Sequence, residues 1–126
     1  MSLRLSVLPG RYGVFCLAAD APLPGWFALA GELAAACRTA DELSLLAPEE
    51  MAPADMPGER GFSAFKVAGP LDFAETGILA AIAQPLAEAE IPIFALSTFE
   101  TDYVLVPAAH FDAAKRILSE RFDFAD

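Results

Sequence analysis

The pattern of apolar and polar positions is clearest in residues 69–107. A helix is predicted over 75–89, because its apolar residues recur three and four apart and so share one face. Two short apolar runs, 91–96 and 103–106, follow it and are rich in β-branched and aromatic residues, as covered strands are. The polar gap between the runs is short, which favours an antiparallel hairpin. With a preceding strand, these elements form the first part of a βαββαβ unit.

Two residues oppose parts of this helix. Pro85 lies in its middle, where a proline loses a backbone hydrogen bond at a cost of about 3 kcal/mol, and it marks where a kink would form. Glu90 stands just after the helix, at a place where glycine would be easier. The apolar periodicity outweighs both objections, so the prediction of a helix stands.

The chain also contains a weak internal repeat. Residues 39–48 align with 98–107, with threonine, leucine and proline at matching places, and residues 13–18 align with 63–68. The spacing between the aligned segments is longer in the second half, by about two and a half turns at 3.6 residues per turn. We therefore expect two related halves, the first with a shortened crossover.

The halves are expected to differ in their connections. A loop rich in Pro, Gly and charge precedes residue 61, which gives domains 1–60 and 61–126. In the first crossover, prolines and a glycine leave room for only one or two helical turns around 26–29. The last helix is predicted over 108–122, with no strand after it. The strand at 3–8 is therefore expected to pair with the second half.

Composition indicates an ordered protein and limits the classes of partner that it could bind. Hydrophobic residues make up 56% and charged residues 21% of the 126 residues, which argues against disorder. The net charge of −10 argues against nucleic acid and against anionic membranes, which both attract Lys and Arg. The same charge mildly favours cationic small molecules and basic partners, although solubility is its commoner role. No secretory signal or membrane span is expected, and the cytoplasm is the default location.

Residue types that carry catalysis or bind metals are sparse. Cys16 and Cys37 lack the spacing of zinc ligands and are expected to be small buried residues without a disulfide. His110, the only histidine, is expected to be solvated in the last helix. The sequence contains no nucleophile motif and no phosphate-binding loop. We therefore expect no cofactor and no metal, and an enzyme would need a polar cluster that the sequence does not show.

Two loops could bind a small molecule. Residues 69–77 open the long helix, whose free N–H groups suit an anion such as a carboxylate, and Gly77 would admit a ligand close to the backbone. The alternative is that Asp72 or Thr76 simply caps the helix. Asp102, at the mouth of the hairpin, could accept hydrogen bonds from an ammonium or guanidinium group, or it could bond its own backbone.

The first half lacks the corresponding acidic residue. Leu43 stands where the second half has Asp102, so the first half has no equivalent site and would line one shared pocket from the other side. Trp26 could cover a ligand there, but core filling is the commoner role of an aromatic residue.

Several segments resemble a known family. They are GPLDF at 69–73, TGIL at 76–79, IPIFALSTF at 91–99 and TDYVLVP at 101–107. These segments are similar to ACT domains, in particular to the small tandem-ACT branch related to the arginine sensors of animal cells. The resemblance implies an α+β fold of two ferredoxin-like halves of βαββαβ type. Antiparallel sheets with helices packed on one face are expected, together with exchange of the N-terminal strand between halves.

The resemblance also implies a function without catalysis, the reversible binding of a free amino acid by a cytoplasmic sensor or regulatory module. Loop 72–78 would hold the α-carboxylate and α-amine, and turn 98–102 would read the side chain. The ligand-binding residues would be Asp72, Phe73, Glu75, Thr76, Gly77, Ile78, Thr98, Phe99, Thr101 and Asp102.

A stand-alone protein of this kind would act through other chains. We expect a homodimer, which the high apolar content favours, and a regulated protein partner. The alternative is a non-catalytic oligomerisation or protein-interaction module whose ligand site is vestigial. Mutation of Asp102 separates the two, because it should abolish the ligand response of a sensor and leave the assembly of a module intact.

Overall fold

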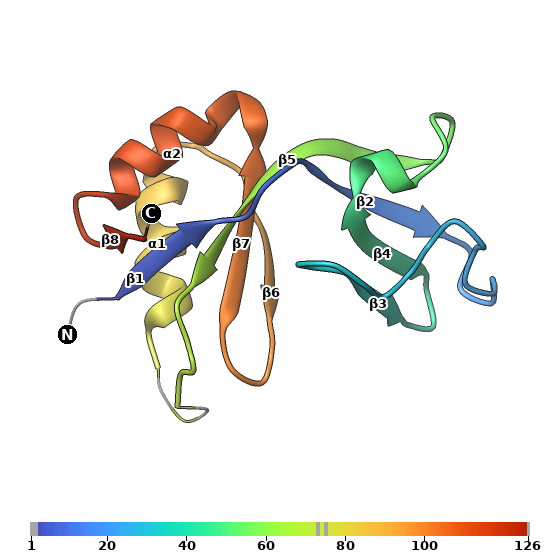
Figure 1. The fold of residues 1–126 in the computed structure, drawn as a ribbon, viewed down its shortest axis with the longest axis horizontal. Coiled ribbons are helices and arrows are strands. Elements are labelled where there is room, and N and C mark those ends of the chain that lie inside the picture. The colour runs from blue at the N-terminus through green and yellow to red at the C-terminus, as the bar shows by residue number, and fades with distance from the viewer. Residues whose placement is uncertain (1–2, 73, 75, 126) are drawn as a thin grey trace. The chain divides into compact units, whose positions relative to one another are not determined.

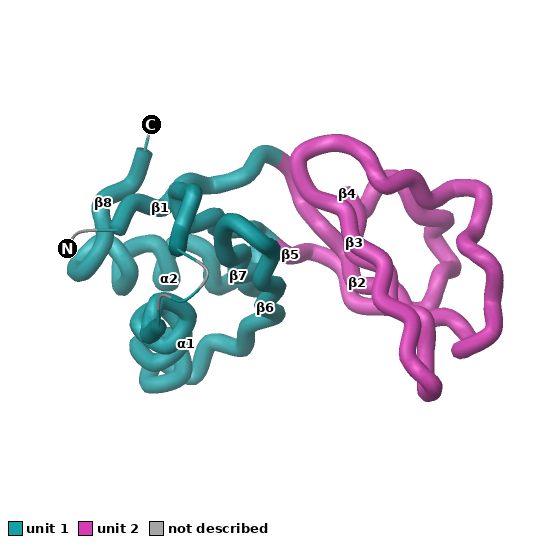
Figure 2. Tube along the Cα trace, turned by 90° about the horizontal axis from the view of Figure 1, so that it is seen from below, with its two compact units in different colours: residues 1–9, 63–126 teal, residues 10–62 magenta. Residues whose placement is uncertain are grey.

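The chain adopts the predicted α+β fold (Figure 1). The computed structural model describes residues 3–72, 74 and 76–125. Along this part of the chain, the elements are β1 (Arg4–Val7), β2 (Tyr12–Leu17), β3 (Ala35–Arg38), β4 (Leu43–Pro48), η1 (Glu49–Met51), β5 (Gly58–Val67), α1 (Ile78–Glu88), β6 (Phe94–Ser97), β7 (Asp102–Pro107), η2 (Ala108–His110), α2 (Phe111–Leu118) and β8 (Asp123–Phe124). They form two compact units, which Figure 2 distinguishes by colour.

Unit 1 consists of residues 1–9 and 63–126, and its strands follow the order β6-β7-β5-β1-β8. β6 and β7 form the predicted antiparallel hairpin, with Ser97 opposite Asp102. α1 and α2 cover one face of the sheet (Figure 1), as predicted. The core between sheet and helices is apolar; its buried members include Leu5, Phe65, Val67, Ile78, Ile82, Leu86, Val104, Val106, Ala114 and Leu118. This core fixes where the start of α1 lies relative to the hairpin.

The N-terminal strand pairs with the second half of the chain, as predicted. β1 lies antiparallel to β5, with Leu5 opposite Val67. The expectation that no strand follows the last helix is wrong, because β8 pairs with β1 in parallel. The backbone N–H groups of Asp123 and Ala125 donate to the carbonyl groups of Leu3 and Leu5. β8 is too short to give an alternating pattern in the sequence, which explains why the pattern misses it.

α1 ends in a motif that places a glutamate in an unusual conformation. The N–H of Ile91 donates to the carbonyl of Leu86, and the N–H of Glu90 donates to that of Ala87, which is the Schellman arrangement. Glu90 accordingly has a φ of 60°, in the left-handed region where glycine is easier. Pro85 lies inside α1 and is buried. Glu90 therefore has the unfavourable backbone conformation that the sequence indicated. The fold tolerates it because the neighbouring Ile91 and Leu86 are buried in the core.

Unit 2 consists of residues 10–62, with the strand order β3-β4-β2-β5 and only residues 58–62 of β5. β2 and β3 both lie antiparallel to β4. The crossover from β2 to β3 contains no helix, which agrees with the expectation of at most one or two turns around 26–29. Pro22 and Pro24 oppose a helix there more strongly than the apolar pattern favours one.

Aromatic side chains cover the core of unit 2 where a helix is absent. Trp26 meets Phe15 edge to face, with 5.5 Å between ring centroids. Phe15, Leu43 and Leu45 are buried in this core. The prediction that Trp26 fills the core is confirmed.

Candidate functional site

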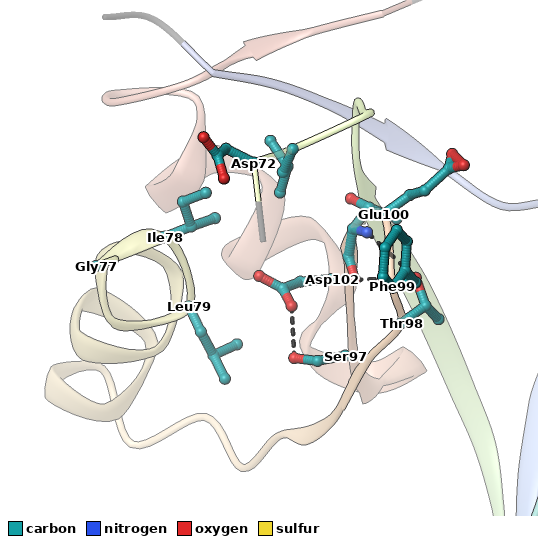
Figure 3. A pocket seen from close by; sticks show the side chains of 11 residues that line it. Asp72, Gly77, Ile78, Leu79, Ser97, Thr98, Phe99, Glu100 and Asp102 are labelled. Atoms are coloured by element: carbon teal, nitrogen blue, oxygen red, sulfur yellow. Dashed lines mark hydrogen bonds between the residues drawn. The ribbon is translucent and has the colours of Figure 1, made fainter. Parts of the chain in front are cut away.

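A cavity of about 290 Å³ opens in unit 1 between the start of α1 and the β6–β7 hairpin (Figure 3). Two segments of the chain, 71–79 and 97–102, form its walls. The lining residues that the structure describes are Leu71, Asp72, Gly77, Ile78, Leu79, Ser97, Thr98, Phe99, Glu100, Thr101 and Asp102. The sheet and the apolar core of unit 1 hold these two segments against each other.

Most of the candidate residues line this one cavity. These are Asp72, Gly77, Ile78, Thr98, Phe99, Thr101 and Asp102. Thr76 is exposed just before α1 and does not belong to the lining. Phe73 and Glu75 lie outside the residues that the structure describes. The sequence thus predicts which two segments meet, while the binding role of each residue stays a prediction.

Four lining residues escaped the sequence analysis: Leu71, Leu79, Ser97 and Glu100. Ser97 could have been found from the hairpin, because the residue opposite Asp102 across a short turn shares its face of the sheet. Glu100 was treated only as part of the polar gap. No pattern in the sequence singles out Leu71 or Leu79.

The first turn of α1 has no side-chain cap. Gly77 is the N-cap, with a φ of 83°, and no side chain in the described part of the chain accepts a hydrogen bond from the helix there. Asp72 instead accepts a hydrogen bond from the N–H of Ala74, at 3.0 Å, within the loop. The alternative in which Asp72 or Thr76 caps α1 is therefore wrong. Helix N–H groups and the positive end of the helix dipole are left at the cavity, where they suit an anion.

The turn between β6 and β7 is held by its own threonines. The N–H of Thr98 donates to the carbonyl of Thr101, at 2.8 Å. The hydroxyl of Thr98 accepts a hydrogen bond from the N–H of Thr101, at 3.2 Å. This closed turn fixes the positions of Phe99 and Glu100 at its tip, and Phe99 is 79% exposed there.

The turn is also tied to the end of β5 and to the loop before α1. The side chain of Thr101 is 7% exposed, and its hydroxyl donates to the carbonyl of Val67. The N–H of Leu71 donates to the carbonyl of Glu100 at 2.7 Å. Gly69 permits this close approach, since a Cβ there would lie 3.0 Å from that same carbonyl oxygen. The Thr101 hydroxyl therefore ties the turn to the end of β5 and is already used by the protein, while the Leu71–Glu100 bond joins the two walls.

Asp102 is the first residue of β7 and is half-buried. Its Oδ1 accepts a hydrogen bond from the hydroxyl of Ser97, at 2.5 Å. In Figure 3 both side chains extend from the hairpin toward the first turn of α1. The alternative of a turn aspartate bonded to its own backbone is wrong, because Ser97 is the partner.

The described lining carries negative charge and no positive charge. Asp72, Glu100 and Asp102 contribute carboxylates, and none of the described lining residues is Lys, Arg or His. A cavity of this kind attracts a cation, while the uncapped helix attracts an anion. The arrangement can therefore hold a zwitterion whose side chain is positively charged.

A second cavity, of about 360 Å³, shares the turn residues 98–101 with the first. Lys66 and Tyr103 complete part of its lining, and the Lys66 ammonium lies 5.9 Å from the centre of the Tyr103 ring. Its wall includes Gly69 and Pro70, so the turn and the 69–71 loop border both cavities.

The remaining chemistry-bearing residues form no site in the described part of the chain. Cys16 and Cys37 are free and exposed, so the expectation that they are buried is wrong. Cys16 on β2 and Cys37 on β3 both lie opposite Ser44 of β4, which separates them. The two cysteines are therefore two strand spacings (~10 Å) apart, which is too far for a disulfide. His110 is exposed, as predicted. Among the described residues, no cluster could hold a metal ion, and no helix is long and apolar enough to cross a membrane.

Comparisons with known proteins find relatives for the part of the chain that carries the cavity. A family model described as ACT domain matches residues 58–120, half of the chain. Over 54 residues, the chain is 44% identical to the cytosolic arginine sensor for mTORC1 subunit 1 of Bos taurus. This match covers 43% of the chain but only 16% of that protein, so the chain spans a small part of its relative.

Solved structures resemble the whole chain. A crystal structure of an Agrobacterium tumefaciens protein is 32% identical, with a TM-score of 0.91, covering 99% of this chain and 93% of that one. A crystal structure of aspartokinase alpha and beta subunits is 16% identical, with a TM-score of 0.66, covering 96% of this chain and 98% of that one. The second likeness concerns the fold alone.

Proposed function

The chain belongs to the ACT domain family, and we propose that its unit 1 binds a free amino acid reversibly as a sensor or regulatory module. The observation that carries this proposal is the lining of the cavity. One wall has the uncapped N-terminus of α1, and the other has the carboxylate of Asp102, which extends toward that helix (Figure 3). Such a pair of walls complements the α-carboxylate at one end of an amino acid and a cationic group at the other.

The size of the cavity fits a single small ligand. Its volume of about 290 Å³ lies at the lower end of the range of about 300–1,000 Å³ that is usual for small-molecule sites. A free amino acid is a ligand of that size class. In this proposal the 72–78 loop takes the backbone groups of the ligand and the 97–102 turn takes its side chain.

A basic amino acid is the ligand class that we propose, with arginine the first to test. The lining has acidic residues and, among those described, no basic one, and this favours a cationic side chain over a neutral or acidic one. The Bos taurus protein that is similar to this chain over 54 residues is an arginine sensor. The family likeness and the charge of the cavity thus favour the same class of ligand independently.

The output of such a sensor would be regulatory and not catalytic. We propose that binding is passed on through a homodimer or a protein partner in the cytoplasm. We also propose that unit 2 is the second, shortened ACT-like half of a tandem, with Leu43 in the place of Asp102. Sedimentation of the protein with and without arginine would show whether ligand and assembly are linked.

Thermal unfolding against each of the twenty amino acids tests the proposal. A ligand that binds only the folded state stabilises it by about 2.7 kcal/mol at one hundred times its dissociation constant. We expect an increase in melting temperature with basic amino acids, largest with arginine, and its loss in Asp102→Ala. Asp123→Ala makes the same change on the exposed part of β8 and should keep the response. If no amino acid shifts the melting temperature at millimolar concentration, the protein is better described as an assembly module with a vestigial site.

A further inference from the structure

Ser97 and Asp102 form a bonded pair inside the cavity. Ser97 ends β6 and Asp102 begins β7, so the two residues face each other across the hairpin. The hydroxyl of Ser97 donates to Oδ1 of Asp102 at 2.5 Å, a distance typical of a strong O–H···O⁻ hydrogen bond. Both residues line the cavity (Figure 3). Nothing in the proposed function requires this bond, so its presence calls for a role.

The bond restricts how the Asp102 carboxylate can be used. An aspartate at the exposed end of a hairpin can rotate between several conformers, and a partner on the opposite strand selects one of them. Oδ1 is occupied by Ser97, which leaves Oδ2 as the less encumbered oxygen of the carboxylate. After donating its proton, the Ser97 hydroxyl still has lone pairs that can accept hydrogen bonds. The pair therefore offers two acceptors side by side, Oδ2 of Asp102 and Oγ of Ser97.

We propose that Ser97 positions Asp102 and completes a two-acceptor site that prefers a guanidinium to an ammonium side chain. A guanidinium has five N–H donors in a planar fork and can address two neighbouring acceptors at once. An ammonium is a compact point charge and depends mainly on the nearby negative charge. This inference rests on the proposed function and adds to it the residue that separates arginine from lysine.

Isothermal titration with L-arginine and L-lysine tests the assignment. Ser97→Ala should weaken arginine binding roughly tenfold, the usual effect of losing one hydrogen bond to a charged group, and weaken lysine binding much less. Ser97→Thr keeps the hydroxyl and should retain most of the preference for arginine. Ser119→Ala is the matched control, because the Ser119 hydroxyl donates to the carbonyl of Lys115 on α2, outside the cavity. It should bind both amino acids like the unmodified protein.

A double-mutant cycle with Asp102→Asn shows whether Ser97 acts through the carboxylate. If it does, Ser97→Ala has little further effect on arginine binding once Asp102 is changed. The inference is overturned if Ser97→Ala, with an unchanged melting temperature, binds arginine and lysine in the same ratio as the unmodified protein. It is also overturned if the effects of the two changes simply add. If the unmodified protein binds neither amino acid, the proposed class of ligand is wrong, and this inference is overturned with it.

Discussion

The hairpins β6–β7 and β3–β4 have turns of the same kind, but different side chains lie at the base of each turn. In β6–β7 the N–H of Thr98 donates to the carbonyl of Thr101, and in β3–β4 the N–H of Thr39 donates to that of Glu42, at 2.8 and 2.9 Å. Each hairpin then runs through a strand that ends in proline and into a 3₁₀ turn, η2 in one case and η1 in the other. The local sequence pattern therefore specifies the same backbone twice.

The residues at the base of each turn are different. Arg38 lies opposite Leu43 in unit 2, where Ser97 lies opposite Asp102 in unit 1. The guanidinium of Arg38 donates to the carbonyls of Ala19 and Ala21, and so holds the crossover in place. One hairpin thus fastens a loop over an apolar core, while the other presents a carboxylate to a cavity.

The crossovers place different features beside the two hairpins. In unit 1 the crossover is α1, which starts with an uncapped N-terminus opposite the turn. In unit 2 the crossover has no helix, and Trp26 and Phe27 pack against the core instead. In the proposed site, the longer crossover would supply the wall that binds an anion, and Asp102 would add the wall that binds a cation.

The largest expected effect comes from placing the acidic residue in the apolar hairpin. Leu43 is 1% exposed, so Leu43→Asp removes buried apolar surface and buries an unpaired carboxylate. We expect unit 2 to lose about 3 kcal/mol or more of stability. Trp26 is the only tryptophan and lies in unit 2, so its fluorescence during urea unfolding follows this loss. Leu29→Asp, at a residue that is 66% exposed, should change stability by no more than about 0.5 kcal/mol.

The reciprocal change should affect binding instead of folding. Asp102→Leu places in unit 1 the residue that unit 2 has at this position. We expect stabilisation by arginine to fall by about 2 kcal/mol, since a hydrogen-bonded charge partner is lost. The thermal unfolding of the variant without ligand should stay close to that of the unmodified protein. A variant that is still stabilised fully by arginine would contradict the role given to Asp102.

A smaller effect is expected from removing the hydrogen bond that ties the turn to the end of β5. Thr101→Val keeps the shape of the side chain but removes the donor to the carbonyl of Val67. Leaving that buried acceptor without its side-chain partner should cost about 1–2 kcal/mol in urea unfolding followed by far-UV circular dichroism. Thr76→Val, at an exposed residue outside the cavity, is the control and should be nearly neutral. Equal effects of the two changes would argue against Thr101 as the tie between the turn and β5.

Much of unit 1 could be predicted because its signals are local and strong. The apolar periodicity around Ile82 gave α1, and the polar gap before Tyr103 gave the hairpin. Asp102 was singled out by its place at the mouth of that hairpin and by the resemblance to ACT domains. The sequence also predicted that the N-terminal strand pairs with the second half, because an edge of the sheet would otherwise lack a partner.

What the sequence did not predict depends on tertiary contacts. Ser97 enters the site only through strand register, and one serine among apolar residues is an ordinary strand residue. Cys16 appeared buried because its neighbours are apolar, but it lies on the exposed face of β2. The pattern near Trp26 limited the crossover to at most two helical turns, but it did not show which side chains cover the core in place of a helix. In each case the sequence gives the type of residue but not the side of the sheet or the partner.

The smallest expected effect concerns the end of α1, the helix that distinguishes the two crossovers. Glu90 has a φ of 60°, and a side chain in this region costs free energy that glycine does not. Glu90→Gly should therefore raise the free energy of unfolding by about 0.5–1 kcal/mol in a urea titration. The same replacement inside α1, Glu88→Gly, should lower it by about 1 kcal/mol, because helical glycine is unfavourable. Opposite signs two residues apart would show that backbone conformation decides the outcome, since both changes remove one negative charge from the same helix end. If Glu90→Gly destabilises as well, interactions of its side chain outweigh the strain of the left-handed backbone.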